Sequence, residues 1–179
     1  MDWLAGIRVL DTTSGIAGAY ATKLFVDAGA EVIKVEPPGG DPLRAWSATG
    51  PLTREGDAPL FCFLHAGKRS AAIPWSADAL APLLSTTDLL VEDGTIPGLD
   101  PAALRQTHPL LVVLSITPWG RTGPEVARPS TEFILQAESG SIASRGAPGG
   151  EPFQAGGRVV EWLAGPFAAV PALAAVQSA

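Results

Sequence analysis

Short apolar runs alternate with longer segments of helical pattern along the first two-thirds of the chain. Residues 7–10, 88–91 and 110–116 are largely apolar, and residues 31–36 alternate charged and aliphatic side chains. Runs of this length and composition are typical of strands. A fifth strand is predicted at residues 69–73. Because strands and helical segments alternate, the pattern predicts a parallel sheet with helices on its faces.

The helices are predicted from their apolar periodicity and from their first residues. Ser76 and Asp100 stand where an N-cap is expected, and Pro101 occupies a first helical position. The last predicted helix contains Pro166 and Pro171, which we expect to lie in turns or to bend it. The predicted helices are residues 17–28, 58–66, 76–84, 101–106, 130–138 and 159–176.

These elements predict one α/β domain over residues 1–179. Residues 1–117 form a Rossmann-like core, a parallel sheet with helices on both faces, and residues 118–179 add a loop and helices. Residues 37–59 form a long predicted loop rich in proline, glycine and charge. Loops of that length are usually functional or packed against a partner.

The loop after the first strand has the composition of a phosphate-binding turn. It reads Ser14-Gly15-Ile16-Ala17-Gly18, and small residues there let a ligand approach the N-terminus of the following helix. Glu36 lies at about the distance expected of a ribose-binding acid. The loop is Gly-x-x-Gly rather than Gly-x-Gly-x-x-Gly, which counts against a nicotinamide dinucleotide.

Eight short motifs follow one another along nearly the whole chain. They are Leu4-Ala-Gly-Ile-Arg-Val-Leu-Asp11, Gly29-Ala-Glu-Val-Ile-Lys-Val-Glu36, Gly40-Asp-Pro-Leu-Arg44, Gly67-Lys-Arg-Ser70, Asp88-Leu-Leu-Val-Glu92, Ser115-Ile-Thr-Pro-Trp-Gly120, Gly123-Pro124 and Gln136-Ala-Glu-Ser-Gly140. In this order they resemble the N-terminal half of the class III CoA-transferases. That family includes formyl-CoA and carnitine CoA-transferases and the related α-methylacyl-CoA racemases.

The resemblance implies a carboxylate nucleophile that attacks an acyl-CoA thioester. In the family an aspartate stands four residues before a glycine in a helix of small residues, and the matching position here is Glu161, before Gly165. A glutamate can form the same acyl anhydride and then the same enzyme-bound CoA thioester. Read without the family, Glu161 is a polar residue at a helix start, where an acid favours the helix dipole.

The resemblance also implies that coenzyme A or acyl-CoA binds as a substrate, with no tightly bound cofactor and no metal. The loop residues Gly15, Ile16 and Ala17 match the turn that wraps the nucleotide in the family. The further candidates for CoA binding are Lys68, Arg69, Ile73 and Asp93.

Racemase chemistry is disfavoured. Moving a proton α to a thioester needs two acid/base groups on opposite faces of the carbon. Glu132 stands where many relatives carry an aspartate, but Thr131 replaces the histidine that precedes it in the racemase branch. His65 and His108 lie in unrelated segments, where we expect surface or loop positions.

The amino-acid composition argues against some classes of binding partner. The net charge of −6 argues against nucleic acid, and the single cysteine, Cys62, is expected to be a small buried side chain. The N-terminus does not read as a signal peptide, and the apolar run at residues 164–176 is too short to span a bilayer. We therefore expect a cytoplasmic protein with no membrane partner.

The family resembled here usually has chains of about twice this length, beyond the usual range for one domain. The leading hypothesis is a CoA-transferase, or one subunit of it, that moves CoA from an acyl-CoA to a carboxylic acid acceptor. It would form homo- or hetero-oligomers, in which a partner chain can supply the missing half. The alternative is a non-catalytic assembly subunit that pairs with a longer homologous chain.

Overall fold

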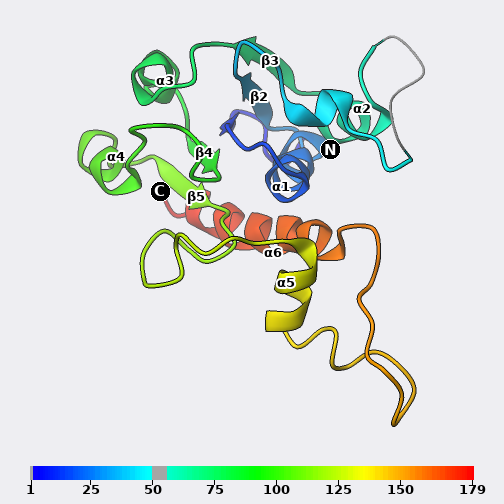
Figure 1. Ribbon diagram of the computed structural model, residues 1–179. Helices are drawn as coiled ribbons and strands as arrows, with labels where there is room; N and C mark the ends of the chain where they lie inside the picture. The colour runs from blue at the N-terminus through cyan, green and yellow to red at the C-terminus, as the bar shows by residue number, and fades with distance from the viewer. Residues whose placement is uncertain (1, 50–55) are drawn as a thin grey trace.

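The computed structural model describes residues 2–49 and 56–179, and its centre is a five-stranded parallel sheet. The strands follow the spatial order β3-β2-β1-β4-β5, which confirms the predicted Rossmann-like α/β fold (Figure 1). Each predicted strand and helix is present within two residues of its expected bounds. The strands are β1 Arg8–Asp11, β2 Glu31–Glu36, β3 Arg69–Ala72, β4 Leu89–Glu92 and β5 Val112–Ser115.

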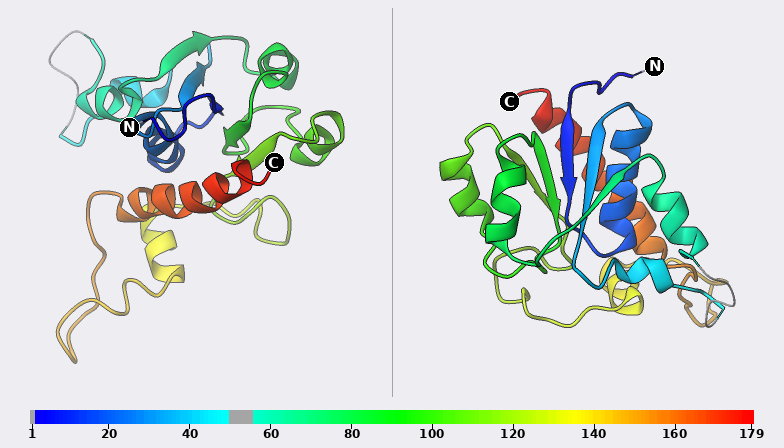
Figure 2. Two further views of the ribbon diagram at one scale, coloured as in Figure 1. Left: turned by 180° about the vertical axis from the view of Figure 1, so that it is seen from behind. Right: turned by 90° about the horizontal axis from the view of Figure 1, so that it is seen from above.

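Helices cover both faces of the sheet (Figure 2). Val9 and Val32 face one apolar cluster, which includes α1 and α6, whereas Leu10 and Leu90 face a second, which includes α3. The opposite faces follow from the two-residue period of a strand. The helices are α1 Ile16–Asp27, α2 Pro59–His65, α3 Ala77–Leu84, α4 Pro101–Thr107, α5 Glu132–Glu138 and α6 Val159–Val176, with a 3-10 turn η1 at Pro42–Ala45.

The last helix is continuous, so its prolines do not lie in turns, which was one of the two expected arrangements. Pro166 and Pro171 are both inside α6. A proline in a helix interior costs about 3 kcal/mol. Burial of Ala169 and Ala172 in the cluster beside α1 and the sheet opposes that cost.

The length of α6 also corrects an expectation. The helix has 18 residues with a mean hydropathy of 1.7, so by length and composition alone it could cross a membrane. Its small residues Gly165, Ala169 and Ala172 are buried against the rest of the fold.

Two further expectations differ from the structure. Cys62 is exposed, because it lies on the outer side of the short helix α2. The predicted loop at 37–59 contains η1, which Asp41 begins by accepting a hydrogen bond from the Leu43 N–H. Residues 50–55 of that loop lie outside the described residues.

The contact between α6 and α1 depends on Gly165. A Cβ atom at this position would lie 3.0 Å from the carbonyl oxygen of Ala17 and 3.1 Å from Cβ of Tyr20. These distances are tighter than ordinary van der Waals contact, so the glycine permits a closer helix approach than alanine does.

Replacing Gly165 by alanine should therefore destabilise the fold. Overpacking costs about 1–3 kcal/mol, whereas the higher helix propensity of alanine returns about 1 kcal/mol. We expect a net loss in the free energy of unfolding, measured by urea denaturation. Gly39→Ala is the control, because a Cβ there meets no atom within 4 Å. An unchanged stability of Gly165→Ala would contradict the close-approach argument.

Candidate active site

A cavity of about 570 Å³ opens where the parallel strands end. It is bounded by the loop after β1, the residues that follow β4 and β5, and the N-termini of α5 and α6. The carboxyl edge of a parallel sheet is where ligands bind in open α/β folds. Its polar and small lining residues include Thr13, Ser14, Gly15, Gly18, Asp93, Thr117, Ser130, Thr131, Glu132, Arg158 and Glu161.

Glu161 reaches from the first turn of α6 to the beginning of α1. Its Oε2 accepts a hydrogen bond of 3.1 Å from the N–H of Ile16, the first residue of α1. The N-cap of α1 is Gly15, which has no side chain to cap the helix. Glu161 therefore caps α1 from another helix, and the positive ends of two helix dipoles meet at its carboxylate.

Arg158 pairs with the other oxygen of the same carboxylate. Its Nε donates to Glu161 Oε1 at 2.8 Å, and its Nη2 contacts the same oxygen. The backbone of Arg158 is left-handed, with φ 57° and ψ 45°. Arginine rarely adopts this conformation, which glycine or asparagine accommodates more readily.

A second glutamate fixes the start of α6. Glu132 Oε1 accepts the N–H of Val160 at 2.9 Å and the side-chain amide of Gln136 at 2.7 Å. Gln136 is fully buried and holds Ala155 through two hydrogen bonds, from the Ala155 N–H to Oε1 and from Nε2 to the Ala155 carbonyl. This clamp ties the segment before α6 to α5 and so places Arg158 and Glu161.

The loop between β1 and α1 is held from beneath by buried Asp11. One carboxylate oxygen accepts the N–H and the hydroxyl of Thr13, and the other accepts Thr22 Oγ1 at 2.6 Å and Lys68 Nζ at 3.1 Å. Burial raises the pKa of Asp11, but Lys68 and Lys34 outweigh it and hold that pKa well below its usual range. Asp11 is therefore a charged and fully hydrogen-bonded anchor.

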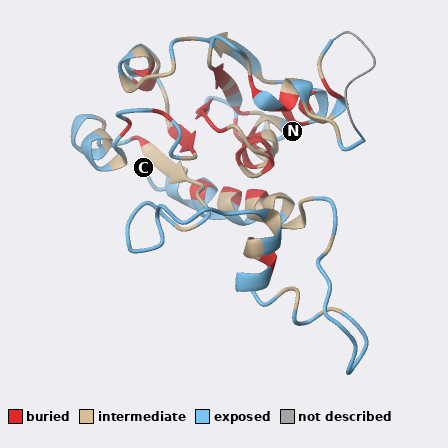
Figure 3. Cartoon of the chain, in the orientation of Figure 1, coloured by how far each residue is buried: buried red, intermediate tan, exposed pale blue. Residues whose placement is uncertain are grey.

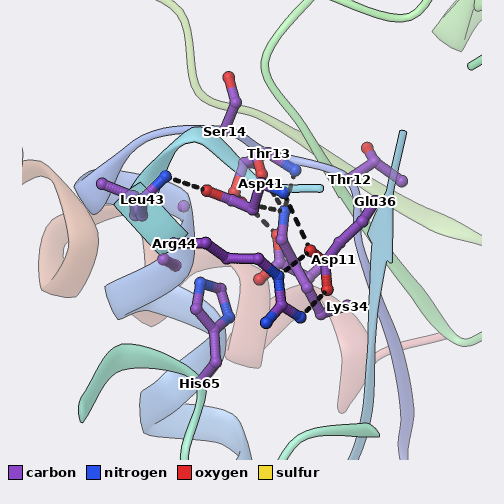
Figure 4. A network of polar contacts seen from close by, with 12 residues as sticks. Asp11, Thr12, Thr13, Ser14, Lys34, Glu36, Asp41, Leu43, Arg44 and His65 are labelled. Carbon is purple, nitrogen blue, oxygen red and sulfur yellow. Dashed lines mark hydrogen bonds and ion pairs between the residues drawn. The ribbon is translucent and has the colours of Figure 1, made fainter. Parts of the chain in front are cut away.

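Lys34 supports the same loop from the neighbouring strand (Figure 4). It is the register partner of Asp11, and its Nζ donates to the carbonyl of Thr13 and pairs with Asp41 at 2.9 Å. The side chains of Lys34 and Asp41 are 2% and 1% exposed, so this is a buried ion pair. It connects the loop after β1 to η1.

Glu36 is also part of this framework, which removes the main support for a dinucleotide site. It accepts Nε and Nη2 of Arg44 at 2.6 and 2.7 Å, the Asp41 N–H, and the Ser70 hydroxyl. The Arg44 hydrogen bonds, set against burial of the side chain, lower the pKa of Glu36 to about 2. Its carboxylate is occupied by protein donors, where a ribose-binding acid would face the ligand.

His65 corrects the expectation of a surface or loop histidine. It is 8% exposed at the end of α2, and its Nδ1 lies 3.2 Å from Lys68 Nζ. Burial, together with the positive charge of Lys68, lowers the pKa of His65 to about 3. The imidazole is therefore neutral in the folded protein at physiological pH. His108, by contrast, is a half-buried residue at the C-terminus of α4.

The structure brings part of the predicted CoA-binding set to the cavity. Gly15 and Ala17 line it, as does Asp93, whose Oδ2 accepts both the N–H and the hydroxyl of Ser14. Ile16 contributes its N–H to Glu161, while its side chain is buried. Their contacts with CoA stay a prediction.

The other predicted residues lie elsewhere. The ammonium group of Lys68 is enclosed by Asp11, Thr22 and the carbonyl of Ala19, so the predicted contact of Lys68 with CoA has no support in this arrangement. Arg69 begins β3 and pairs with Glu31 at the amino edge of the sheet, opposite the cavity. Ile73 packs beside the cluster under α3.

Sequence reasoning missed Arg158 and the clamp formed by Glu132 and Gln136. The pair Gly157-Arg158 directly before a predicted helix resembles an ordinary loop, and nothing local indicates that both residues are left-handed. The signal that could have found Arg158 is its spacing, since a charge three residues before Glu161 can lie on the same helix face.

Comparison with known proteins identifies the family. The family model of CoA-transferase family III matches residues 4–179. The chain is 35% identical over 189 residues to succinate–glutarate CoA-transferase of Agrobacterium fabrum, covering 98% of this chain and 46% of that protein. It is 33% identical over 185 residues to the beta subunit of succinyl-CoA–L-malate CoA-transferase of Chloroflexus aurantiacus, covering 97% of this chain and 45% of that protein.

A solved structure agrees with the sequence matches. The crystal structure of Rv3272 from Mycobacterium tuberculosis superposes with a TM-score of 0.81 at 34% identity, covering 97% of this chain and 51% of that chain. The protein therefore belongs to CoA-transferase family III. It spans about half the length of the curated relatives it matches.

Because His65 is buried and neutral, we expect the free energy of unfolding to fall in mild acid. Its folded pKa of about 3 is below the unfolded value of 6.5, so its contribution is complete above pH 6.5 and is lost as the pH falls toward 3. For one proton the slope is about 1.4 kcal/mol per pH unit. We expect His65→Gln to flatten the free energy of unfolding between pH 6.5 and 5, measured by urea denaturation.

His108→Gln is the matched control, because that side chain lies outside the buried cluster and its loss should leave the slope unchanged. An identical slope in wild type and His65→Gln would contradict the assignment.

Proposed function

We propose that this chain forms part of the active site of a CoA-transferase in which Glu161 is the nucleophile. The Glu161 carboxylate attacks the thioester carbonyl of an acyl-CoA, the C–S bond breaks, and CoA leaves as the thiolate. The product is a mixed anhydride between Glu161 and the acyl group. This is covalent catalysis, which replaces one difficult exchange by two easier steps.

The second step converts the anhydride into an enzyme-bound thioester. The CoA thiolate attacks the side-chain carbonyl of Glu161, the C–O bond breaks, and the donor acid leaves as its carboxylate. Negative charge develops on the glutamyl oxygen when the thiolate adds, before the C–O bond breaks. The N–H of Ile16, 3.1 Å from Glu161 Oε2, is in place to donate to that oxyanion at the positive end of α1. A second carboxylic acid completes the exchange by the reverse sequence.

The contact between Glu161 and the first N–H of α1 is the observation that carries the proposal. The Glu161 carboxylate lines the cavity beside the loop that contains Gly15 and Ala17, which supports the proposed roles of that carboxylate as the nucleophile and of that loop in binding CoA. Relatives named for succinate, glutarate and malate transfer support small dicarboxylic acids as the acceptors to test.

The proposal predicts exchange of labelled succinate into succinyl-CoA by the purified chain. Glu161→Gln should reduce the exchange rate by a factor of about 10⁴ or more, as loss of a covalent nucleophile does. Intact-mass measurement after incubation with succinyl-CoA should show a CoA thioester on wild type and none on the variant.

Glu151→Gln is the control, because Glu151 is an exposed glutamate in the loop before α6. It should exchange label at the wild-type rate. A Glu161→Gln protein that exchanges label as fast as wild type would show that the nucleophile is another residue.

A second candidate function is supported by the outer face of α6. Four large apolar residues on that face are exposed, and the opposite side of the helix is buried against the fold (Figure 3). Such a stripe is typical of an interaction surface. In this alternative the chain is an assembly subunit whose α6 stripe binds a longer homologous chain. The residues of the α6 stripe are Leu163, Phe167, Val170 and Leu173.

The alternative predicts an association that depends on the α6 stripe. Phe167 is 77% exposed, and Phe167→Asp should convert the assembled species to the monomer, measured by light scattering of the purified chain with its longer homologue. Leu110→Asp is the matched control, since Leu110 is 71% exposed on a different part of the fold. A wild-type chain that stays monomeric in that mixture, while exchanging CoA alone, would reject the alternative.

A further inference from the structure

Negative charge dominates the cavity. Asp93, Glu132 and Glu161 line it, and among the described lining residues Arg158 alone carries a positive charge. Asp93 is already occupied by Ser14 and Thr95. Glu132 Oε2 is buried and has no hydrogen-bond partner within the described residues. An anionic acid that enters this cavity is repelled unless its carboxylate pairs with Arg158.

Arg158 is not available while Glu161 is a free carboxylate. Both Nε and Nη2 point to Glu161 Oε1, so the two side chains neutralise each other. The exposed fractions of the two side chains are 39% and 22%, so the pair is open to the cavity and to solvent. Such a partly exposed pair is held weakly enough to exchange partners.

The chemistry of the proposed function changes the charge of Glu161 and so its pairing with Arg158. Glu161 loses its charge in the anhydride and remains uncharged in the CoA thioester. In the anhydride the donor acid is bonded to Glu161 and the negative charge lies on the CoA thiolate, whereas in the CoA thioester state the donor acid has been released as a carboxylate. Between the free enzyme and the CoA thioester, the number of carboxylates that need a cation is therefore constant, but the carboxylate has moved from Glu161 to the acid substrate.

We propose that Arg158 binds the carboxylate of the acid substrate and changes partner during the reaction. It pairs with Glu161 in the free enzyme and with the departing or entering acid once Glu161 carries CoA as a thioester. This inference rests on the proposed function and adds an acid-binding residue to it. A guanidinium suits the role, because its fork can hold both oxygens of a carboxylate.

The partner exchange also orders the substrates. In the free enzyme an acid competes with Glu161 for Arg158, so the acid binds weakly. In the CoA thioester state Arg158 has no protein carboxylate to hold, and the acid binds more tightly. The donor acyl-CoA therefore reacts before the acceptor acid is bound.

The experiment measures binding of succinate alone, without turnover. Glu161→Gln removes the competing charge and so imitates the uncharged, acylated side chain. Isothermal titration should show succinate binding to Glu161→Gln at least ten times tighter than to wild type. In the double variant Glu161→Gln/Arg158→Asn this gain should disappear, whereas Glu161→Gln/Arg158→Lys should keep part of it.

Asparagine is chosen at position 158 because it tolerates the left-handed backbone and can serve as an N-cap, so the start of α6 should be retained. Circular dichroism and the free energy of unfolding check that each variant is folded. Equal succinate affinity in Glu161→Gln and in the folded double variant with asparagine would overturn the proposal, as would an affinity of Glu161→Gln no greater than that of wild type.

The outcome is separable from that of the nucleophile assignment. Succinate binding is read without acyl-CoA, so Arg158 can be confirmed even if label exchange shows another nucleophile. Conversely, loss of exchange in Glu161→Gln with no gain in succinate affinity would retain the nucleophile and reject the role of Arg158.

Discussion

The geometry of the cavity depends on charges buried under the loop between β1 and α1. Asp11 holds the N–H and hydroxyl of Thr13, while Lys34 holds the carbonyl of the same residue. Removing two charges from water costs several kcal/mol each, and such pairs often add little net stability. Here the charges fix a position, because both the N–H and the carbonyl of Thr13 are held three residues before Ile16, the first residue of α1.

Hydrogen bonds between helices then fix the position of the Glu161 carboxylate as well. The N-cap of α1 is a glycine and that of α6 is an arginine, and neither residue caps its own helix with a side-chain hydrogen bond. Instead Glu161 of α6 caps α1, and Glu132 of α5 caps α6. The starts of α1 and α6 therefore keep these hydrogen bonds only when α6 and α5, respectively, are docked, which links formation of the site to folding of residues 132–179.

Local patterns were sufficient to predict the strands and helices, because the strand period, the N-caps and the turns of small residues each depend on residues that are close in the sequence. They failed where a long-range contact decides the outcome. From the sequence, His65 is a polar residue at a helix end, but α2 directs its side chain toward the buried cluster of Asp11 and Lys68. Pro166 and Pro171 indicate breaks, yet packing against α1 keeps α6 continuous. The pairing of Arg158 with Glu161 required the left-handed backbone at residue 158, which no propensity predicts.

The fit between α6 and α1 also explains why a glutamate suits the proposed nucleophile position. The two helices are held in contact at Gly165, where even a methyl group would meet the Ala17 carbonyl at 3.0 Å. One turn earlier in α6, the side chain of residue 161 must span the distance between the two helices to reach the N–H of Ile16 in α1. Glutamate does so at 3.1 Å. An aspartate on the same backbone would be shorter by about 1.5 Å, the length of one carbon–carbon bond. To recover the hydrogen bond α6 would have to move toward α1, and the contact at Gly165 opposes that movement. On this backbone, the glutamate at 161 and the glycine at 165 thus both fit the same separation between α6 and α1.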